Sequence, residues 1–466
     1  MDFFGRGGEL GRLRSILDRR HPSLVLVSGV RGGGKTALVR RALKDYRGVI
    51  HQAPPLPDPT QRAGLRDVLR RASAELGLPA PPEEGVPDWS QIFAEAAAVA
   101  SRGDRPFVLV IDDAHRLAEA RSRYVEALTA TLSTARERGV PIHVVLIGQE
   151  HGLPDPDRMA PLTLEALSLG PLPFRSAQNF FPTLSASDRV RAYAVFGGLP
   201  RVLESVDRDV TVETNTRRLL LDPAGTLRDA GSNWLERDLQ TPARYNAIMS
   251  SLASGEGNWS TVHDGVPDLT SSGQVAPYLT RLEQLGLLRA RRSLDAGPRT
   301  RARRYAITDP FLAFWFRFVM PRRWGEPPIP PNEYYSQVIR SAMGPHVESV
   351  FPMICRQHMS FDAIETLGAN AREAGSIWGP HVEIPVAGIL TSGAAYYGSC
   401  HWGAPARTAE PVRALDAAIR ETRYGFGRER RVRVLFTGRS APRWLQREVA
   451  RRHDAQLIDA EALAGD

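Results

Sequence analysis

Residues 29–36 read Gly29-Val30-Arg31-Gly32-Gly33-Gly34-Lys35-Thr36 and match the pattern GxxxxGK[ST] at every fixed position. In this pattern, the P-loop, glycines let backbone N–H groups turn toward the α- and β-phosphates, the lysine reaches the β- and γ-phosphates, and the hydroxyl holds Mg²⁺. Lys35 is one of only two lysines, although the chain holds 60 Lys and Arg residues. Arginine's broad planar fork cannot replace a point charge in so tight a loop. The stretch therefore predicts binding of a nucleoside triphosphate.

The flanks of the loop fit this interpretation. Residues 24–28 form a short apolar run without charge, which is typical of a strand buried on both faces of a parallel sheet. Residues 37–43 have helical spacing, so the loop opens a helix whose N-terminus faces the phosphates. A chance glycine-rich turn is the alternative, and the order strand, loop, helix argues against it. We expect the nucleotide contacts to come from Gly29, Gly32, Gly33, Gly34, Lys35, Thr36 and Ala37.

A second motif supplies carboxylates. The apolar run 107–111 predicts a buried strand, and Asp112 and Asp113 follow where it ends. We expect this strand to be adjacent to the strand before the P-loop, with Asp112 holding Mg²⁺ and Asp113 orienting or deprotonating the attacking water. The alternative is that the two acids are solvated and cap the next helix.

Three further segments are candidates for nucleotide contacts. Gln149 follows the apolar run 142–148 and either contacts the γ-phosphate and the water or is an ordinary strand-end residue. Arg6 lies in a segment, 4–10, that opens a helix and is expected to shape the adenine side of the pocket. Gly198 and Pro200 form a rigid turn that either packs on the flat base or is a simple helix break.

Composition sets the broad class. A chain of 466 residues with 42% hydrophobic residues predicts several domains, each with a core. The formal charge of +8 permits contact with nucleic acid or another acidic partner. Cys355 and Cys400 are far apart in the sequence and have no metal-ligand spacing, which favours a reducing compartment without disulfides. The N-terminus lacks the layout of a signal peptide, and no apolar run is long enough to span a bilayer. We expect a cytoplasmic protein without a membrane partner.

The order of these motifs carries a resemblance. FxGRxxEL at 3–10, the P-loop, the strand with two aspartates, the strand with Gly148-Gln149, and GGLP at 197–200 together resemble the archaeal-type ATPases of the STAND branch of AAA+-like P-loop proteins. The resemblance covers essentially the whole chain and is strongest over 1–320. It implies that Asp113 stands where other ATPases have Glu, that Gln149 is the sensor 1 residue, and that Gly198 and Pro200 lie near the adenine. It also implies a nucleotide-driven switch with slow turnover.

The expected fold class is α/β, with a P-loop core and parallel sheet over 1–175. Within that core, 56–88 is interpreted as an insertion with one helical stretch, 65–76. A helical lid over 176–240 and a winged helix-turn-helix over 241–320 follow, the latter read from two helices and a hairpin. The proline-rich segment 321–334 is interpreted as a linker.

The expected wing, 289–304, is rich in arginine. A cluster on a narrow hairpin suits phosphate contacts with double-stranded DNA, which give affinity without sequence reading. The alternative is a protein–protein or intramolecular module with a solvated basic face. The arginines are Arg289, Arg291, Arg292, Arg299, Arg301, Arg303 and Arg304.

The last domain, 335–466, shows a helix at 335–358, paired strands at 382–387 and 395–402, and a later strand at 431–436. The resemblance implies a restriction-endonuclease-like fold, in which relatives carry Glu-Ile-Asp on one strand and Glu-Cys-Lys-Trp on the next. This chain has Glu383-Ile384-Pro385 and Ser399-Cys400-His401-Trp402 instead. Glu348 and Glu383 do not by themselves make a two-ligand site with a base. Cys400 and His401 are adjacent on a strand and point to opposite faces. We therefore interpret the domain as a degenerate nuclease fold used for binding or assembly.

The sequence as a whole predicts an ATP- and Mg²⁺-dependent switch that hydrolyses ATP slowly. Two alternatives stay open: a DNA-binding regulator in which ATP is structural, and an ATP-dependent nuclease in which a rearranged site survives. The output partner is either DNA, a protein or another copy of the chain.

Overall fold

The structure, a computed structural model, describes residues 4–75, 87–103, 105–119, 123–149, 152–155, 164–239, 242–266, 272–297, 300, 302–324, 329–403, 405, 408 and 410–465. The chain divides into two compact units. The first comprises residues 1–170 and 284–286, and the second comprises 171–283 and 287–466. Within the described ranges, no helix is both long enough and apolar enough to cross a bilayer.

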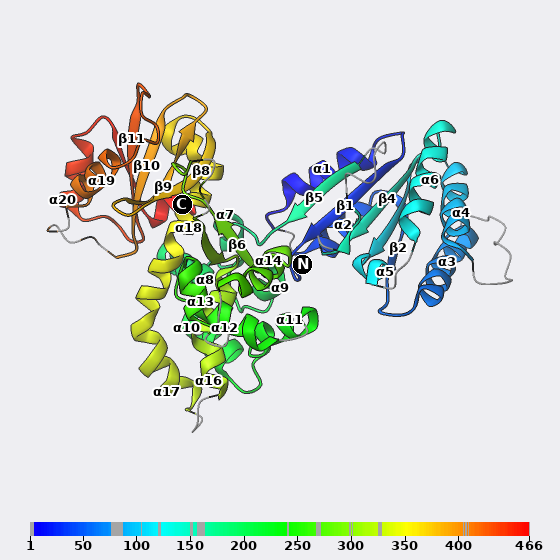
Figure 1. The fold of residues 1–466 in the computed structure, drawn as a ribbon, viewed down its shortest axis with the longest axis horizontal. Helices are drawn as coiled ribbons and strands as arrows, with labels where there is room; N and C mark the ends of the chain where they lie inside the picture. Colours follow the sequence, from blue (N-terminus) through cyan, green and yellow to red (C-terminus); the bar gives the residue numbers. More distant parts are fainter. Residues whose placement is uncertain are drawn as a thin grey trace. The chain divides into compact units, whose positions relative to one another are not determined.

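The first unit is built on a five-stranded parallel sheet (Figure 1). Its strands are β1 (Ser23–Gly29), β2 (Arg47–Gln52), β3 (Phe107–Asp112), β4 (Ile142–Ile147) and β5 (Leu164–Leu169), in the order β2-β3-β4-β1-β5. The three apolar runs seen in the sequence form the three central strands, which confirms the parallel sheet. The expectation that the strand of Asp112 is adjacent to the P-loop strand is wrong, because β4 lies between β3 and β1.

Helices cover both faces of this sheet. Helices α1 (Gly7–Leu17) and α2 (Lys35–Leu43) pack on one face, and α3 (Asp58–Glu75), α4 (Trp89–Ser101) and α6 (Tyr124–Glu137) pack on the other (Figure 1). The short α5 (His115–Glu119) follows β3. Each face buries its own apolar cluster, as expected for a parallel sheet.

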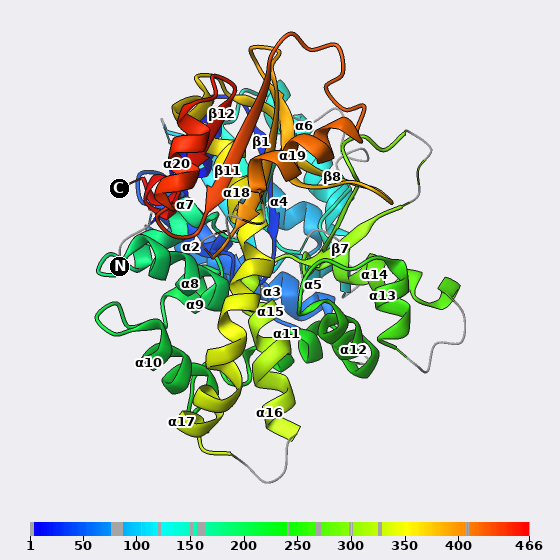
Figure 2. The ribbon, with the colours of Figure 1, turned by 90° about the vertical axis from the view of Figure 1, so that its left-hand side faces the viewer.

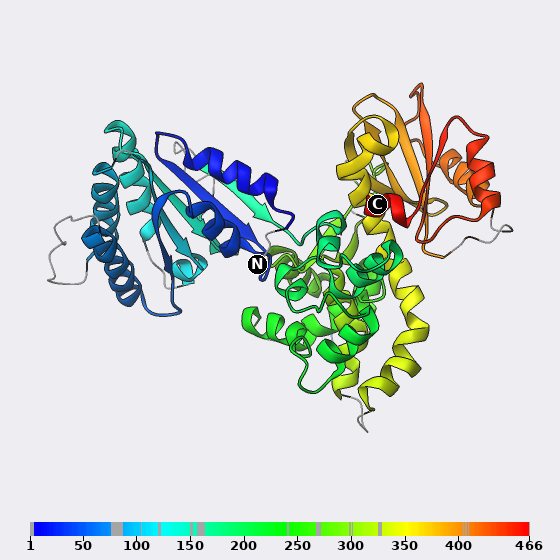
Figure 3. The same cartoon turned by 180° about the vertical axis from the view of Figure 1, so that it is seen from behind.

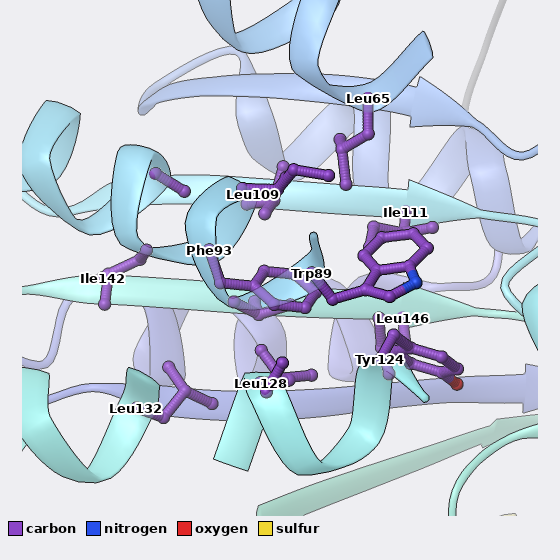
Figure 4. Close-up of a cluster of buried hydrophobic side chains, with 14 of the residues drawn as sticks. Leu65, Trp89, Phe93, Leu109, Ile111, Tyr124, Leu128, Leu132, Ile142 and Leu146 are labelled. Carbon is purple, nitrogen blue, oxygen red and sulfur yellow. The ribbon is translucent and has the colours of Figure 1, made fainter. Parts of the chain in front are cut away.

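The face covered by α3, α4 and α6 is rich in aromatic side chains (Figure 4). Trp89 stacks on Phe93 with ring centroids 5.7 Å apart and meets Tyr124 at 5.9 Å. The Trp89 indole N–H donates to Asp58 at 2.8 Å, which ties the start of α4 to the start of α3. The segment interpreted as an insertion thus supplies α3 to the core, where Leu65 and Leu69 are buried. Its helix begins at Asp58, earlier than the predicted Leu65. Leu76 lies outside the described residues.

The second unit begins with short helices. They are α7 (Phe174–Ala177), a 3₁₀ turn (Gln178–Phe180), α8 (Ala186–Phe196), α9 (Pro200–Leu203), α10 (Val212–Thr216), a π-helical turn (Arg217–Leu221) and α11 (Ala230–Asp238). They fall where the sequence predicts a helical lid. Helix α8 is buried along most of its length and contacts α15 (Pro310–Phe314) and α18 (Arg340–Leu367).

Three helices and a hairpin occupy the expected winged-helix region. Helices α12 (Pro242–Leu252), α13 (Trp259–Asp264) and α14 (Ala276–Gln284) precede the antiparallel pair β6 (Leu288–Arg291) and β7 (Arg304–Ile307). The sequence did not predict α13, which has only six residues. Asn258 marks its start, since its side chain accepts a hydrogen bond from the Thr261 N–H at 2.9 Å.

The expected linker is largely helical. Helix α16 (Met320–Trp324) continues a π-helical turn (Trp315–Val319), and α17 (Pro331–Tyr334) leads through a second one (Tyr335–Ile339) into α18. Proline starts α17 because its missing N–H costs nothing at the first helical position. One of the prolines that suggested a linker, Pro331, therefore begins a helix.

The C-terminal part holds a second five-stranded sheet (Figures 2 and 3). Its strands are β8 (Ala371–Trp378), β9 (Glu383–Leu390), β10 (Ala395–His401), β11 (Arg431–Thr437) and β12 (Ala455–Ile458), in the order β12-β11-β10-β9-β8. Strands β8, β9 and β10 pair antiparallel, whereas β10, β11 and β12 pair parallel. The expected α/β pattern with β9 and β10 paired is confirmed.

Helices flank this mixed sheet. The long α18, yellow in Figure 2, contacts β8, β9 and β10, and α19 (Pro411–Arg420) contacts β9, β10 and β11. Helix α20 (Arg443–Ala450) contacts β12, and α21 (Ala460–Ala464) contacts both β12 and α8. Cys355 of α18 and Cys400 of β10, although far apart in the sequence, lie together as free thiols. Burial, and then the hydrogen bond with Cys400, raise the pKa of Cys355.

Candidate functional site

The loop between β1 and α2 has a backbone that only glycine adopts easily. Gly29, Gly32 and Gly34 have φ of 138°, 78° and 88°. A Cβ on Gly29 would lie 2.1 Å from the carbonyl oxygen of Leu169 on β5, so the loop and β5 approach too closely for a side chain. Gly34 is the N-cap of α2 and has no side chain to occupy the helix N-terminus, which leaves the first N–H groups of α2 directed at the loop.

The lysine and threonine of the motif lie at the start of α2. The Lys35 ammonium donates to the carbonyls of Gly29 and Val30, both at 2.9 Å, and so lies over the loop itself. The Thr36 hydroxyl donates to Asp112 Oδ2 at 2.7 Å. This bond spans β4 and joins the helix after the P-loop to the end of β3. The residue pair predicted from two separate motifs therefore meets in the fold.

Asp112 and Asp113 have different surroundings. Asp112 is 6% exposed, and its second oxygen accepts the Asp113 N–H at 2.9 Å. Asp113 adopts φ of 56°, a left-handed conformation that is uncommon for a residue other than glycine and marks functional sites more often than chance would give. Its carboxylate accepts from Gln52 Nε2 at 3.3 Å and lies 3.5 Å from the Arg116 guanidinium. Asp112 thus lies inward against Thr36, whereas Asp113 is turned away and partly open to solvent.

Gln149 follows the strand between these two motifs. Strand β4 ends at Ile147, and the Gly148 N–H donates to Val27 of β1 while the Ile147 carbonyl accepts from Ala114 after β3. Gln149 is 9% exposed. Because β4 is the central strand, its carboxyl end lies between the end of β1 and the end of β3. A side chain at this position is therefore placed between the P-loop and the two aspartates.

Arg6 is the buried residue that ties the N-terminal segment to the P-loop. It is 6% exposed, donates to the Gly33 carbonyl at 3.1 Å and to the Gly170 carbonyl, and pairs with Glu9 at 2.9 Å. The sequence placed Arg6 on the adenine side of the pocket. In the structure it lies against Gly33, the middle residue of the run 32–34, and so ties the N-terminal segment to the loop. Its place on the adenine side stays a prediction.

Gly198 and Pro200 lie in the second unit, whereas the P-loop lies in the first, so their predicted contact with adenine stays a prediction. Within the second unit Gly198 makes a tight turn, and a Cβ on it would lie 2.0 Å from the Leu172 carbonyl oxygen. Its N–H donates to Asp309 Oδ2 at 2.8 Å, and Pro200 opens α9.

Asp309 is a residue that the sequence reading missed. It is 2% exposed, and its other oxygen caps α15 by accepting the Phe311 N–H at 2.9 Å. Burial raises its pKa to about 7, against the two backbone hydrogen bonds that lower it. The signal was present in the sequence, since Asp309-Pro310 before an apolar run is typical of a helix start.

Two arginines of the expected wing bond to other parts of the second unit. Arg291 bonds to Glu256 and to Ser376 of β8, and Arg304 makes two bonds of 2.7 Å to Glu383 of β9. Both guanidiniums also lie over the Trp378 ring, at 5.8 and 4.8 Å from its centroid. In the described part of the chain, Arg292 and Arg303 are the exposed arginines of this hairpin, while Arg299 and Arg301 lie outside it.

The residues that the sequence analysis compared with a nuclease site bond to other residues of the second unit. The Pro385 carbonyl accepts from the Arg356 guanidinium at 2.8 Å, and the Glu383 carboxylate is paired with Arg304. On β10, His401 Nε2 lies 3.3 Å from Ser399 Oγ, and burial lowers the pKa of His401. No group of three or more His, Cys, Asp or Glu side chains able to hold a metal occurs among the described residues.

Glu348 is the remaining acid of this region. Its carboxylate accepts the Trp402 N–H at 3.0 Å. Burial raises its pKa, whereas the backbone bonds to Trp402 and Gly403 lower it. Cys400 contacts Cys355 rather than His401, in agreement with the expectation that adjacent strand residues point to opposite faces.

Comparison with known proteins identifies the first unit. Residues 2–147 match the family model described as an AAA ATPase domain, so this part of the chain is an AAA ATPase domain built on a P-loop. An uncharacterized protein of Methanocaldococcus jannaschii is 22% identical over 332 residues, which cover 68% of this chain and 69% of that protein.

Solved structures of ATPases are similar at low identity. A Walker-type ATPase of Pyrococcus abyssi is 16% identical with a TM-score of 0.49, covering 68% of this chain and 96% of its own. The Aeropyrum pernix ORC2 protein, solved as ADPNP–ADP complexes, is 15% identical with a TM-score of 0.41, covering 68% and 93%. A STAND protein with a tetratricopeptide repeat sensor from Pyrococcus horikoshii is 13% identical with a TM-score of 0.32, covering 78% and 51%.

Proposed function

We propose that the protein hydrolyses ATP in a Mg²⁺-dependent reaction in which Lys35, Thr36, Asp112, Asp113 and Gln149 act together. The observation that carries the proposal is the 2.7 Å bond between Thr36 and Asp112, which brings the hydroxyl of the P-loop and the acid of β3 to one point. A hydroxyl and a carboxylate are hard oxygen donors, and Mg²⁺ prefers one or two such protein donors with phosphate and water oxygens completing its shell. The residues present therefore fit this ion.

The roles follow from position. The glycine loop and the first N–H groups of α2 bind the α- and β-phosphates, and Lys35 leaves its two carbonyl partners to bind the β- and γ-phosphate oxygens. Mg²⁺ held by Thr36 and Asp112 would neutralise charge on the phosphates. Asp113, turned away from Asp112, orients or deprotonates the water that attacks the γ-phosphate, and Gln149 contacts that phosphate.

The exchange of Asp113 for Asn tests these roles with little disturbance of the backbone. Asn tolerates the left-handed conformation that residue 113 adopts, so the fold is preserved while the carboxylate is lost. We expect ATP affinity within a few-fold of wild type and phosphate release reduced by about 10²–10⁴-fold, the usual contribution of a general base. Turnover at the wild-type rate in Asp113→Asn would remove the proposed role.

We further propose that ATP hydrolysis is slow and serves a switch that acts on the second unit. The proposed division of that unit is a lid over 176–240, a winged helix over 241–320, a connecting segment over 321–334 and the C-terminal domain over 335–466. Support comes from the packing, since α8 of the lid contacts both α15 and α18, and the hairpin β6–β7 bonds to β8 and β9. On this proposal, the second unit moves as one body when the bound nucleotide changes.

The C-terminal domain is proposed not to cleave DNA. Cleavage in this fold needs carboxylates that converge on a divalent cation. Here the Arg356 guanidinium lies against Pro385, and the Glu383 carboxylate is paired with Arg304. Buried positive charge repels a second cation. Plasmid and linear DNA incubated with the protein in Mg²⁺ or Mn²⁺ are expected to stay intact, and cleavage lost in Glu383→Ala or His401→Ala would show an active rearranged site.

DNA binding through the hairpin is the second candidate, with ATP acting as a structural ligand. It rests on Arg292 and Arg303, which are exposed. Fluorescence anisotropy with duplex DNA, at two salt concentrations and with ATP or ADP, separates the candidates. Binding that weakens with salt, depends on Arg303 and changes with nucleotide supports a switch on DNA. Binding indifferent to nucleotide supports the structural role, and no binding leaves a protein partner or self-assembly as the output.

A further inference from the structure

Three arginines surround one glutamate in the second unit. Arg291 of β6 and Arg356 of α18 both donate to Glu256 Oε1, and Arg356 does so at 3.0 Å. Their side chains are only 14% and 12% exposed, and that of Glu256 is 22% exposed. Arg289 of β6 lies close enough to Glu256 and Arg356 to affect their charge states. The cluster therefore joins the hairpin, the segment after α12 and the long α18.

The cluster carries more positive than negative charge. Burial lowers the pKa of Arg289, Arg291 and Arg356, and in each case a neighbouring arginine lowers it further. The pKa of Arg291 falls to about 10, so the guanidinium is still protonated at neutral pH. Three cations then face the single carboxylate of Glu256, whose pKa is lowered because the attraction of Arg356 and Arg291 outweighs its own burial. Charges removed from water are costly unless they are paired.

Arg289 is the member with an unsatisfied buried donor. Among the described residues, its Nε is buried and donates no hydrogen bond. Arg291 and Arg356, by contrast, already have acceptors in Glu256, Ser376 and Pro385. A buried donor that makes no hydrogen bond is costly, and more so when it is charged. Arg289 therefore brings an unsatisfied buried donor to the cluster.

A cavity lies beside Arg289. Its volume is about 40 Å³, and Arg289, Arg356 and Glu256 form its polar wall, while Val350 and Met353 form part of its apolar wall. One water needs about 10–15 Å³ by this measure, so the cavity is about three times larger than a single water requires. It is far below the roughly 300 Å³ at which pockets for nucleotides and other small organic ligands begin.

We propose that this cavity binds one inorganic oxyanion of phosphate size, held by Arg289 and Arg356. The anion supplies the negative charge that the cluster lacks and accepts the hydrogen bond that the Arg289 Nε does not make inside the chain. Guanidinium groups are suited to this ligand, since their planar donors match oxyanion geometry. The bound anion joins β6 to α18 and so stabilises the packing of the hairpin on the C-terminal sheet.

Calorimetric titration with inorganic phosphate tests the proposal. The measurement is made on the full chain carrying Lys35→Ala, at constant ionic strength, so that phosphate binding by the P-loop does not contribute. Glu256→Gln, added to that chain, removes the internal competitor for the arginines and is expected to tighten phosphate binding several-fold. Arg289→Gln is expected to weaken it at least tenfold, because the unsatisfied buried donor is lost.

Arg303→Gln is the matched control, since Arg303 lies on the same hairpin and is exposed. It is expected to leave the phosphate affinity unchanged. Equal losses in Arg289→Gln and Arg303→Gln, or no phosphate binding in the parent chain, would overturn the proposal. If Arg289→Gln fails to fold, as judged by circular dichroism, Glu256→Gln decides: unchanged or weaker phosphate binding in that variant also overturns it.

A single-stranded oligonucleotide added to the same titration separates a free anion from a nucleic-acid phosphate. The cavity is too small for a nucleoside, so the oligonucleotide is expected not to compete with phosphate. Competition that depends on Arg289 would reassign the site to a phosphodiester backbone and overturn the proposal of a free anion. Because Lys35→Ala disables the P-loop in every arm, failure here leaves the proposed ATPase function untouched.

Discussion

The two five-stranded sheets carry charges of opposite sign at the positions where the sequence analysis expected functional residues. At the end of β3 an aspartate bonds to a threonine hydroxyl, and we propose that this pair of oxygens binds a cation. At β9 a proline carbonyl bonds to a guanidinium, which already occupies that place with positive charge. Both sheets have apolar central strands and helices beside them, so the fold alone does not separate a catalytic site from a structural one. The sign of the buried charge separates them, since it is negative at the end of β3 and positive at β9.

Asp309 provides the largest expected effect in the second unit. Because its pKa is raised to about 7 in the fold, the folded protein binds a proton between pH 4 and 7 that the unfolded chain has released. The stability contributed by Asp309 is thus complete below pH 4 and is lost as the pH rises to 7, at about 1.4 kcal/mol per pH unit.

Urea unfolding of wild type and Asp309→Asn, followed by tryptophan fluorescence from pH 4 to 7, measures this loss. Seven of the eight tryptophans lie in the second unit, so the signal reports mainly on it. The difference in unfolding free energy between wild type and variant should fall as the pH rises. A difference that is constant with pH would show that Asp309 is ionised throughout the range.

Arg356 tests whether the guanidinium at β9 is structural. Arg356→Gln leaves Glu256 with one strong partner fewer and the Pro385 carbonyl without its donor. We expect the unfolding free energy of the second unit to fall by about 3 kcal/mol, as when one partner of a buried ion pair is removed. Arg372→Gln, on the exposed side of β8, is the control and should cost less than about 0.5 kcal/mol. Equal effects would mean that the cluster does not stabilise the sheet.

Substitution of Arg6 tests whether a buried guanidinium is also structural in the first unit. Arg6→Gln removes a charged donor from the Gly33 carbonyl, which should destabilise the loop by about 2 kcal/mol and weaken ATP binding. Arg12→Gln, on the helix α1 that Arg6 precedes, removes only a surface pair with Glu165 and should have little effect. Amide hydrogen exchange of residues 29–36 gives the local effect. Exchange rates that are the same in Arg6→Gln and Arg12→Gln would show that Arg6 does not hold the P-loop.

The pair Arg304–Glu383 is expected to have the smallest effect. Glu383 is 56% exposed, so the ion pair and the contact of Arg304 with Trp378 together contribute about 0.5–1 kcal/mol. A double-mutant cycle with Arg304→Gln and Glu383→Gln measures the coupling energy. A coupling energy above about 2 kcal/mol would mean that this exposed pair stabilises the protein as much as a buried ion pair does. The expected difference between Arg304 and the buried Arg356 would then be wrong.

The sequence predicted the central strands of both sheets and missed their edges. Strands β1, β3, β4, β9, β10 and β11 are the apolar runs that the sequence marks, whereas β2, β5, β8 and β12 were not predicted. All four missed strands are edge strands. An edge strand is covered less completely by its neighbours, so polar and apolar residues are mixed along it. The apolar pattern that would reveal the strand is therefore weak. In β8, for example, Arg372 and Glu373 are exposed.

The site was predicted where a motif fixes local chemistry and not where distant elements meet. Lys35 and Thr36 follow from the loop, and Asp112 from the end of an apolar run. The insertion of β4 between β1 and β3 depends on the order of strands, which no local pattern encodes. The sequence does not show that Glu256, Glu383 and Trp378 lie beside arginines of the hairpin, since these residues are distant along the chain. Binding of DNA by the hairpin stays a prediction. The roles of Lys35, Thr36 and Asp112 in catalysis and binding stay predictions, as do those of Asp113, Gln149, Gly198 and Pro200.

The central claim is that the P-loop of the first unit binds ATP through Lys35. Isothermal titration of ATP with Mg²⁺ into wild type, Lys35→Ala and Lys44→Ala tests it most directly, because these are the two lysines of the chain and Lys44 is exposed at the far end of the same helix. We predict that ATP binding is lost, by at least a hundredfold, in Lys35→Ala and unchanged in Lys44→Ala. ATP affinity in Lys35→Ala equal to that of wild type would contradict the account.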